Sequence, residues 1–158
     1  MKEVYANLKA LAESHQHKND VAVSYLPKGL VMRLSDQALF DVGQAAISPQ
    51  AIPLLQKIGA SIAKTAHEVR IEGHTDDVPI KTVQYPSNWE LSTARAVNVL
   101  RYFIQSYGIS SKRLSAEGFS RYQPIVPNDS PVNRAKNRRV EIVFLNPDKA
   151  GRSVEAGP

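Results

Sequence analysis

Three short clusters stand out among the residues of this chain whose types could carry chemistry. They are residues 73–77 (GHTDD), 88–96 (NWELSTARA) and 137–142 (NRRVEI). Asn88 and Arg95 are seven residues apart, so a helix places them two turns apart on nearly the same face. A carboxylate at the end of the preceding strand, such as Asp76, could then lie close to Arg95. The spacing therefore predicts one acidic and one basic group at the rim of a pocket.

A pocket of this kind suits a zwitterionic ligand. Asp76 would accept hydrogen bonds from an ammonium group, and the planar guanidinium of Arg95 would hold a carboxylate with two parallel bonds. Free N–H groups at the start of the helix would also favour an anion. The alternative is a simple ion pair between Asp76 and Arg95 that fastens a loop to a helix, and such pairs are common. The two residues alone leave both interpretations open.

Three other chemistries have weaker support. His74 could be a metal ligand, but no second His or Cys with ligand spacing follows it. Ser92 lacks the G-x-S-x-G setting and the convincing base that a nucleophile needs. The basic segment 137–139 has no interleaved aromatic residues and matches no nucleic-acid-binding motif. We therefore expect no catalytic residue, no metal or other cofactor and no nucleic-acid partner.

The composition sets outer limits on these interpretations. Lys and Arg number 20 against 15 Asp and Glu, so the net charge of +5 favours an anionic partner such as nucleic acid, anionic lipid or a carboxylate-rich polymer. The chain has no cysteine, which excludes a disulfide framework, a thiolate metal site and a Cys nucleophile. No apolar run approaches the ~20 residues that span a bilayer, and the first residues do not resemble a signal peptide. Such a chain is either cytoplasmic or a soluble piece of a longer membrane protein.

Hydrophobic spacing indicates the elements of the first half of the chain. A helix is expected over residues 1–16, and its narrow apolar stripe needs a partner in a second chain or in the body of the domain. Two strands are expected over 21–26 and 30–34, joined by a short turn. Ser48 is then predicted to cap a helix that Pro49 opens. The stripe of the first helix is Val4, Leu8, Leu11 and His15, and that of the second is Ala51, Ile52, Leu55, Ile58 and Ile62.

The second half of the chain contains the elements that must position the chemical clusters. A strand is expected over 68–75 and a long polar loop over 76–87. Ser87 and Glu90 have the spacing of a capping box, so a helix begins there, and Gly108 is well placed to end it. The predicted buried stripe of this helix is Trp89, Ala96, Val99, Leu100, Phe103 and Tyr107.

The order of elements predicts an α+β fold. Strands over 114–119 and 139–145 complete the series, with a Pro- and Asn-rich loop over 123–133 and a short helix between them. Helices would pack on a mixed sheet of about four to five strands, which is a two-layer βαβ sandwich. The expected organisation is a linker helix over 1–20, one domain over 21–146 and a flexible tail over 147–158.

In these clusters the sequence resembles the OmpA-like peptidoglycan-binding family. The shared motifs are G-H-T-D, N-x-x-L-S-x-x-R-A, a Gly-containing strand and N-R-R-V-E, in this order and over roughly residues 29–145. The resemblance implies a mixed βαβ sandwich that binds the wall peptide without breaking a bond. It also implies that Asp76 and Arg95 hold the diaminopimelate side chain. The residues that it places at or near the pocket are Asp76, Arg95, Asn88, Leu91, Thr75 and Arg138.

The loop before the second motif resembles that of one branch of this family. Residues 77–87 form a longer loop than in the outer-membrane lipoprotein branch, and 85–92 (YPSNWELS) is similar to flagellar stator B subunits of the MotB type. This similarity implies a periplasmic homodimer that anchors a stator to peptidoglycan while ion flow drives rotation. It further implies an inner-membrane helix, outside this sequence, that contacts a stator A subunit. The alternatives are an anchor of an outer-membrane lipoprotein or porin and, with less support, a wall hydrolase.

Overall fold

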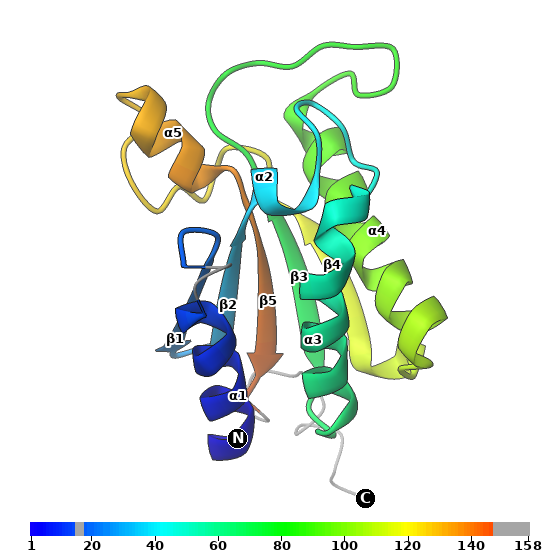
Figure 1. Ribbon diagram of the computed structural model, residues 1–158. Coiled ribbons are helices and arrows are strands. Elements are labelled where there is room, and N and C mark those ends of the chain that lie inside the picture. The colour runs from blue at the N-terminus through cyan, green and yellow to red at the C-terminus, as the bar shows by residue number, and fades with distance from the viewer. Residues whose placement is uncertain (15–17, 147–158) are drawn as a thin grey trace, which may run out of the picture.

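A five-stranded mixed sheet organises the described part of the chain, residues 1–14 and 18–146 of the computed structural model (Figure 1). The strands lie in the order β1-β2-β5-β3-β4. β3 and β4 are parallel, and the other neighbours are antiparallel. The strand bounds are β1 Val21–Leu26, β2 Gly29–Ser35, β3 Val69–His74, β4 Leu114–Gly118 and β5 Arg139–Leu145.

Helices α1, α3 and α4 pack on one face of this sheet, which confirms the expected α+β two-layer arrangement (Figure 1). The shorter helices α2 and α5 lie at the same end of the sheet as the first turns of α4. The helix bounds are α1 Lys2–Glu13, α2 Asp36–Leu39, α3 Ile52–Ala63, α4 Asn88–Tyr107 and α5 Pro131–Asn137, with 3₁₀ turns η1 Pro49–Ala51 and η2 Ser111–Arg113.

Strand β5 shows how the two faces of the sheet differ. Side chains alternate along a strand, so Val140, Ile142 and Phe144 point into the main core under the helices. Glu141 and Val143 point to the opposite face and are also buried. A central strand with both faces covered explains why every residue of β5 is buried.

Helix α4 begins and ends at the predicted residues, Asn88 and Tyr107. The Ser87 hydroxyl accepts a hydrogen bond from the Trp89 N–H at 3.1 Å and donates one to the Glu90 carboxylate at 2.6 Å. The cap is therefore present, although it is not the reciprocal exchange of a capping box. Gly108 ends the helix in the left-handed region, with φ of 59°.

The prediction that Trp89 is buried was wrong, since the side chain is 47% exposed. Its angular position on α4 agrees with that of Ala96, which is buried. The reason is length: a helix of 20 residues is ~30 Å long, whereas the six residues of β3 span ~20 Å. One end of α4 must therefore extend past the sheet, and the first turn does so.

Two smaller predictions also need correction. Ser48 does not cap a helix with its side chain, because its hydroxyl donates to the Leu39 carbonyl at 3.1 Å instead. The chain first forms the turn η1, and α3 begins at Ile52. The loop expected over 123–133 ends early, because Ser130 caps α5 by accepting a hydrogen bond from the Asn133 N–H at 3.1 Å.

Helix α1 packs on the body of the domain. Val4, Leu8 and Leu11 are buried in the main core, and the Tyr5 ring stacks on Tyr25 of β1 with centroids 4.8 Å apart. His15 and the segment 147–158, for which the sequence analysis made predictions, lie outside the described residues. Among the helices that the structure describes, none has the length and apolar character needed to cross a bilayer.

Candidate functional site

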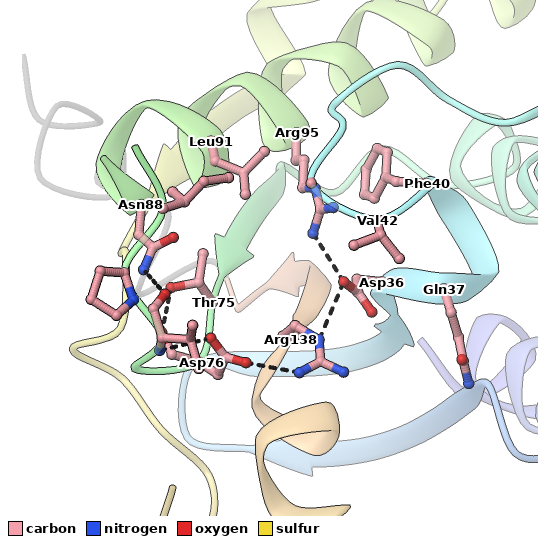
Figure 2. Close-up of a pocket in the computed structure, with 14 residues that line it drawn as sticks. Asp36, Gln37, Phe40, Val42, Thr75, Asp76, Asn88, Leu91, Arg95 and Arg138 are labelled. Atoms are coloured by element: carbon pink, nitrogen blue, oxygen red, sulfur yellow. Dashed lines mark hydrogen bonds and ion pairs between the residues drawn. The ribbon is translucent and has the colours of Figure 1, made fainter. Parts of the chain in front are cut away.

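A pocket of about 520 Å³ opens at the end of the sheet where β3 ends (Figure 2). It lies between α2, the residues that follow α2, the loop after β3 and the first turns of α4. The six residues that the sequence resemblance implies all line it: Thr75, Asp76, Asn88, Leu91, Arg95 and Arg138.

The end of β3 places Thr75 and Asp76 at the mouth of the pocket. The Thr75 N–H donates to the Ser120 carbonyl at 2.9 Å, which ties this strand end to the turn after β4. The Asn88 side-chain amide donates to the Val78 carbonyl at 3.0 Å, so the start of α4 holds the loop that follows Asp76. Two backbone segments far apart in the sequence thereby fix the acidic side of the pocket.

Gly73 allows α4 to cross close over β3. A Cβ atom at this position would collide with the backbone carbonyl of Ser92 on α4. The close approach brings Arg95, one turn further along α4, over the end of the sheet. Gly73 therefore serves close packing, which is the structural role that a strand-end glycine often has.

Four charged side chains cross the pocket in alternating sign (Figure 2). Arg138 donates from Nη1 to Asp76 Oδ2 at 2.8 Å, and its Nε lies 3.5 Å from Asp36 Oδ2. Arg95 donates from Nη1 to the same Asp36 oxygen at 3.2 Å. The Asp76–Arg95 ion pair considered from the sequence is not among the contacts of the described residues. Each of these two residues has a different partner, and both face the same pocket.

Arg95 is only 4% exposed, and several groups contact its guanidinium. Its Nε donates to the Gln44 carbonyl at 2.8 Å, its Nη2 to the Asp41 carbonyl at 3.4 Å, and its guanidinium lies 4.6 Å from the Phe40 ring centre. Burial lowers the pKa of Arg95, and the charge of Asp36 opposes this effect. Because an arginine starts from a very high pKa, the guanidinium remains a fixed positive charge.

Asp76 and Arg95 both keep hydrogen-bonding capacity for a ligand. Asp76 accepts from the Val78 N–H at 3.0 Å and from Arg138, whereas a carboxylate has about four acceptor positions. Arg95 uses three of its five N–H groups for partners in the described residues. An ammonium and a carboxylate could therefore bind at opposite ends of the pocket without breaking the existing network.

Asp36 is the charged pocket residue that the sequence analysis missed. It follows β2 directly and lies in the first turn of α2, where it accepts from both arginines. A buried arginine requires a counter-ion, so a search for a strand-end carboxylate could have found Asp36. The carbonyl partners of Arg95 in the following loop carry no such signal, because any residue type supplies a carbonyl.

Ser92 and Asn137 have structural roles. The Ser92 hydroxyl donates to the Trp89 carbonyl at 3.2 Å and accepts from the Ser120 N–H at 3.1 Å. The Asn137 side chain accepts from the N–H groups of Ile125 and Val126 and donates to the Val126 carbonyl. These contacts use the polar atoms of both residues inside the protein.

A second charged cluster lies on the sheet face opposite the helices. Glu72, His74 and Glu141 present ligand atoms within 4.8 Å of one another, which is a spacing that a metal ion could bridge. Glu72 and Glu141 already accept hydrogen bonds from cationic side chains, namely Lys28, Arg33, Arg70 and Arg139. A metal ion would have to displace them, so the cluster is better described as a charge network within the sheet.

Burial and the neighbouring polar groups together set the charge states in this network. Burial alone would raise the pKa of Glu72, but the hydrogen bond from His74 and the charges of Lys28 and Arg70 lower it to about 2. Burial lowers the pKa of His74, with a contribution from Arg139, against the opposing hydrogen bond to Glu72. His74 Nδ1 is buried without a partner among the described residues, which is consistent with a neutral ring that donates from Nε2 to Glu72 at 3.1 Å.

Solved structures of two known proteins share this fold. The cell wall anchor of the T6SS from Pseudomonas aeruginosa is 36% identical with a TM-score of 0.79, and the match covers 88% of this chain and 97% of that one. The periplasmic domain of Helicobacter pylori MotB is 29% identical with a TM-score of 0.74, and the match covers 86% and 88% of the two chains.

Sequence comparison gives the same relationship. Motility protein B of Bacillus subtilis is 31% identical over 146 residues, which are 92% of this chain and 56% of that protein. The chain spans about half the length of the curated relatives that it matches. A family model described as the OmpA family matches residues 39–138, which include the end of β3, the start of α4 and Arg138. The chain therefore belongs to the OmpA family.

Proposed function

We propose that this domain binds peptidoglycan by holding the zwitterionic end of a diaminopimelate residue in the pocket. The observation that carries the proposal is the unused hydrogen-bonding capacity of Asp76 and Arg95 on opposite sides of one cavity. Asp76 accepts the ligand ammonium, and Arg95 donates to the ligand carboxylate. Charge-assisted hydrogen bonds of this kind each contribute ~1.5–3 kcal/mol.

The remaining lining suits the rest of that ligand. Leu91, Phe40 and Val78 line the same cavity, so they can contact the methylene groups between the two charged ends. Arg138 and Asp36 join the two polar ends through their ion pairs and hold them apart at a fixed spacing. A ligand that lacks either charge would lose one set of these charge-assisted hydrogen bonds, which gives the pocket its selectivity.

The biological role proposed is wall anchoring of a flagellar stator. The support is the similarity to Motility protein B over nearly the whole chain and to a MotB periplasmic domain. In this role the domain lies in the periplasm and pairs with a second copy. A membrane helix in the longer protein joins it to a stator A subunit, and ion flow there drives rotation against the anchored wall contact.

A second candidate role is anchoring of a different envelope machine. It is favoured by the likeness to the T6SS cell wall anchor, which has higher sequence identity than the MotB periplasmic domain. The pocket chemistry is the same in both roles. Restoration of swimming by the full-length gene in a strain that lacks its stator B subunit distinguishes them, as does copurification with a stator A subunit.

The proposed binding is not catalytic. Ser92 and His74, the residues considered for bond cleavage, have their polar atoms engaged or buried within the protein. Incubation of the domain with sacculi is therefore expected to release no soluble muropeptides, and release would support the hydrolase alternative.

The test of binding is co-sedimentation with purified sacculi. Asp76→Asn keeps an oxygen for the Val78 N–H but removes the charge, and Arg95→Lys keeps the charge but removes the planar fork. Both are expected to weaken binding at least about tenfold. The matched controls are Asp77→Asn and Arg134→Gln, an ion pair at 3.1 Å whose members do not line the pocket.

A change on the ligand side tests the same contact. Acetylation of the free amino groups of the sacculi removes the ammonium that Asp76 is proposed to accept, so the parent protein should bind these sacculi as weakly as Asp76→Asn binds untreated ones. The proposal fails if the parent binds acetylated and untreated sacculi equally, or if the control variants lose as much binding as the pocket variants.

A further inference from the structure

We propose that an exposed aromatic platform formed by Trp89 and Tyr122 binds the sugar strand of the same wall polymer. This inference rests on the proposed function, because it takes peptidoglycan as the ligand of the neighbouring pocket. The pocket would hold the peptide, and the platform would hold the glycan to which the peptide is attached. The pocket and the platform are neighbours on α4, because Asn88 lines the pocket and the next residue, Trp89, belongs to the platform.

The platform consists of two large rings that pack on each other and remain open to solvent. The Trp89 and Tyr122 rings stack with centroids 5.4 Å apart and planes 24° apart. After this stacking, 47% of Trp89 and 59% of Tyr122 are still exposed. The Arg121 guanidinium lies 5.1 Å from the centre of the Tyr122 ring. Exposed Trp, Tyr and Arg side chains in one group are typical of binding surfaces.

The chemistry of the platform suits a pyranose. A sugar ring presents C–H groups on its faces, which pack on aromatic rings, and hydroxyl and acetamido groups at its edges. The Tyr122 hydroxyl and the Arg121 guanidinium can form hydrogen bonds with those edges. Trp89 does not serve the hydrophobic core instead, because the first turn of α4 extends past the sheet and leaves the indole 47% exposed.

The backbone that presents Tyr122 is held in an unusual conformation. Ser120 has φ of 54°, a left-handed value that is uncommon for a residue other than glycine. Its N–H donates to the Ser92 hydroxyl at 3.1 Å, and its carbonyl accepts from the Thr75 N–H at 2.9 Å. The same turn therefore fixes both Thr75 of the pocket and Tyr122 of the platform.

These backbone contacts weaken a purely structural explanation for the ring pair. The turn is already joined to α4 by the Ser92 hydroxyl and to the end of β3 by Thr75, so exposed rings are not needed to hold it. Backbone strain at a non-glycine residue is also typical of functional sites, where the surrounding structure fixes the geometry.

The pocket and the platform are close enough for one ligand to reach both. Asn88 and Trp89 are consecutive, so their Cα atoms lie ~3.8 Å apart. Diaminopimelate is the third residue of a stem peptide, and three extended residues span ~10 Å. A peptide bound in the pocket therefore brings its own sugar within reach of the platform without further extension of the polymer.

The experiment uses the fact that Trp89 is the single tryptophan of the chain. Its fluorescence is titrated with peptidoglycan glycan strands from which an amidase has removed the peptides. The expected result is a saturable change in Trp89 emission that Tyr122→Ala weakens about tenfold and Tyr122→Phe largely keeps. Asp76→Asn should titrate like the parent, because the pocket takes no part in this contact.

A tyrosine far from the site provides the matched control. Tyr25 is also exposed and also stacks on another ring, that of Tyr5, so Tyr25→Ala should leave the titration unchanged. Far-ultraviolet circular dichroism confirms that each variant is folded. If glycan strands leave Trp89 emission unchanged while the parent still binds sacculi, the platform is wrong and the pocket stands. If the parent binds neither sacculi nor glycan strands, the proposed function fails and this inference fails with it.

Discussion

Two carboxylates face each other across the centre of the sheet, Glu72 on β3 and Glu141 on β5. Like charges in directly opposite positions destabilise a sheet unless cations compensate them. Lys28 contacts both carboxylates, at 3.2 Å and 3.3 Å, and Arg139 lies 2.6 Å from Glu141. Burial would raise the pKa of Glu72, but the hydrogen bond from His74 and the charges of Lys28 and Arg70 outweigh it and lower this pKa to about 2.

His74 next to this network predicts a loss of stability in weak acid. Burial lowers its pKa below the ordinary histidine value of 6.5, so below pH 6.5 the unfolded chain takes up a proton that the folded chain does not. The free energy of unfolding should therefore fall as the pH drops through 6.5 toward the folded pKa. His74→Gln, which can still donate to Glu72, should flatten this slope in urea titrations between pH 7.5 and 5.

Glu72 acts in a separate pH range, which provides the internal control. Its stabilising contribution is fully present above the unfolded pKa of 4.5 and is lost as the pH falls from there toward about 2. His74→Gln should keep this lower transition. An equal slope between pH 7.5 and 5 in the parent and in His74→Gln would contradict the role given to His74.

Asp36 is expected to contribute strongly to stability, because it is the shared counter-ion of Arg95 and Arg138. Asp36→Asn leaves the buried Arg95 without an anionic partner, so we expect a loss of about 3 kcal/mol in the free energy of unfolding. Asp77→Asn is the matched control, since the Asp77–Arg134 pair is about one-third exposed on both sides and should change stability by less than about 1 kcal/mol. Equal losses in chemical denaturation would contradict this assignment.

The sequence predicted the two ends of the pocket better than its middle. Asp76 follows the end of a strand and Arg95 lies on one face of the next helix, so their spacing predicts that they lie close together. The pairing of each with its actual partner depends on Asp36 and Arg138, which come from opposite ends of the chain. No local pattern connects residues so far apart, so the ion pairs could only be seen in the folded structure.

The crossing of α4 over β3 depends on the absence of a side chain at Gly73. Gly73→Ala should cost about 1–3 kcal/mol or more, because the new methyl group meets the rigid Ser92 carbonyl. Gly108→Ala is the comparison: its φ of 59° is strained for alanine, but nothing lies within 4 Å of the added methyl group. We expect a smaller loss there, about 1 kcal/mol, in thermal or urea unfolding. A larger loss at Gly108 would contradict the close-packing role of Gly73.

Element bounds were predictable where local chemistry determines them. Ser87 and Gly108 act on the backbone within one turn, so both ends of α4 agree with the sequence. Ser48 could not be interpreted locally, because its hydroxyl partner is the distant Leu39 carbonyl. The exposure of Trp89 likewise depends on the relative lengths of α4 and β3, a property of two elements together rather than of either sequence segment.

At the scale of the whole molecule, the α1 residues that stabilise the core and the residues that line the pocket lie in different parts of the structure. Helix α1 contributes Val4, Leu8 and Leu11 to the main core and contributes no lining residue to the pocket. The pocket lies at the end of the sheet near α2 and α5, and α1 packs against β1 and α3 (Figure 1). This arrangement indicates that α1 supports the domain without covering the proposed wall-binding end.

Leu8→Ala tests this separation. Leu8 is fully buried, so its truncation should lower the free energy of unfolding by about 2–5 kcal/mol and leave one cooperative transition. Binding to sacculi by the folded variant should equal that of the parent, because no pocket residue moves. Asn7→Ala, at the neighbouring exposed position, should leave stability unchanged or slightly higher, since alanine favours a helix. If Leu8→Ala changed sacculus binding under conditions where the protein is folded, α1 would have to act on the pocket as well as on the core.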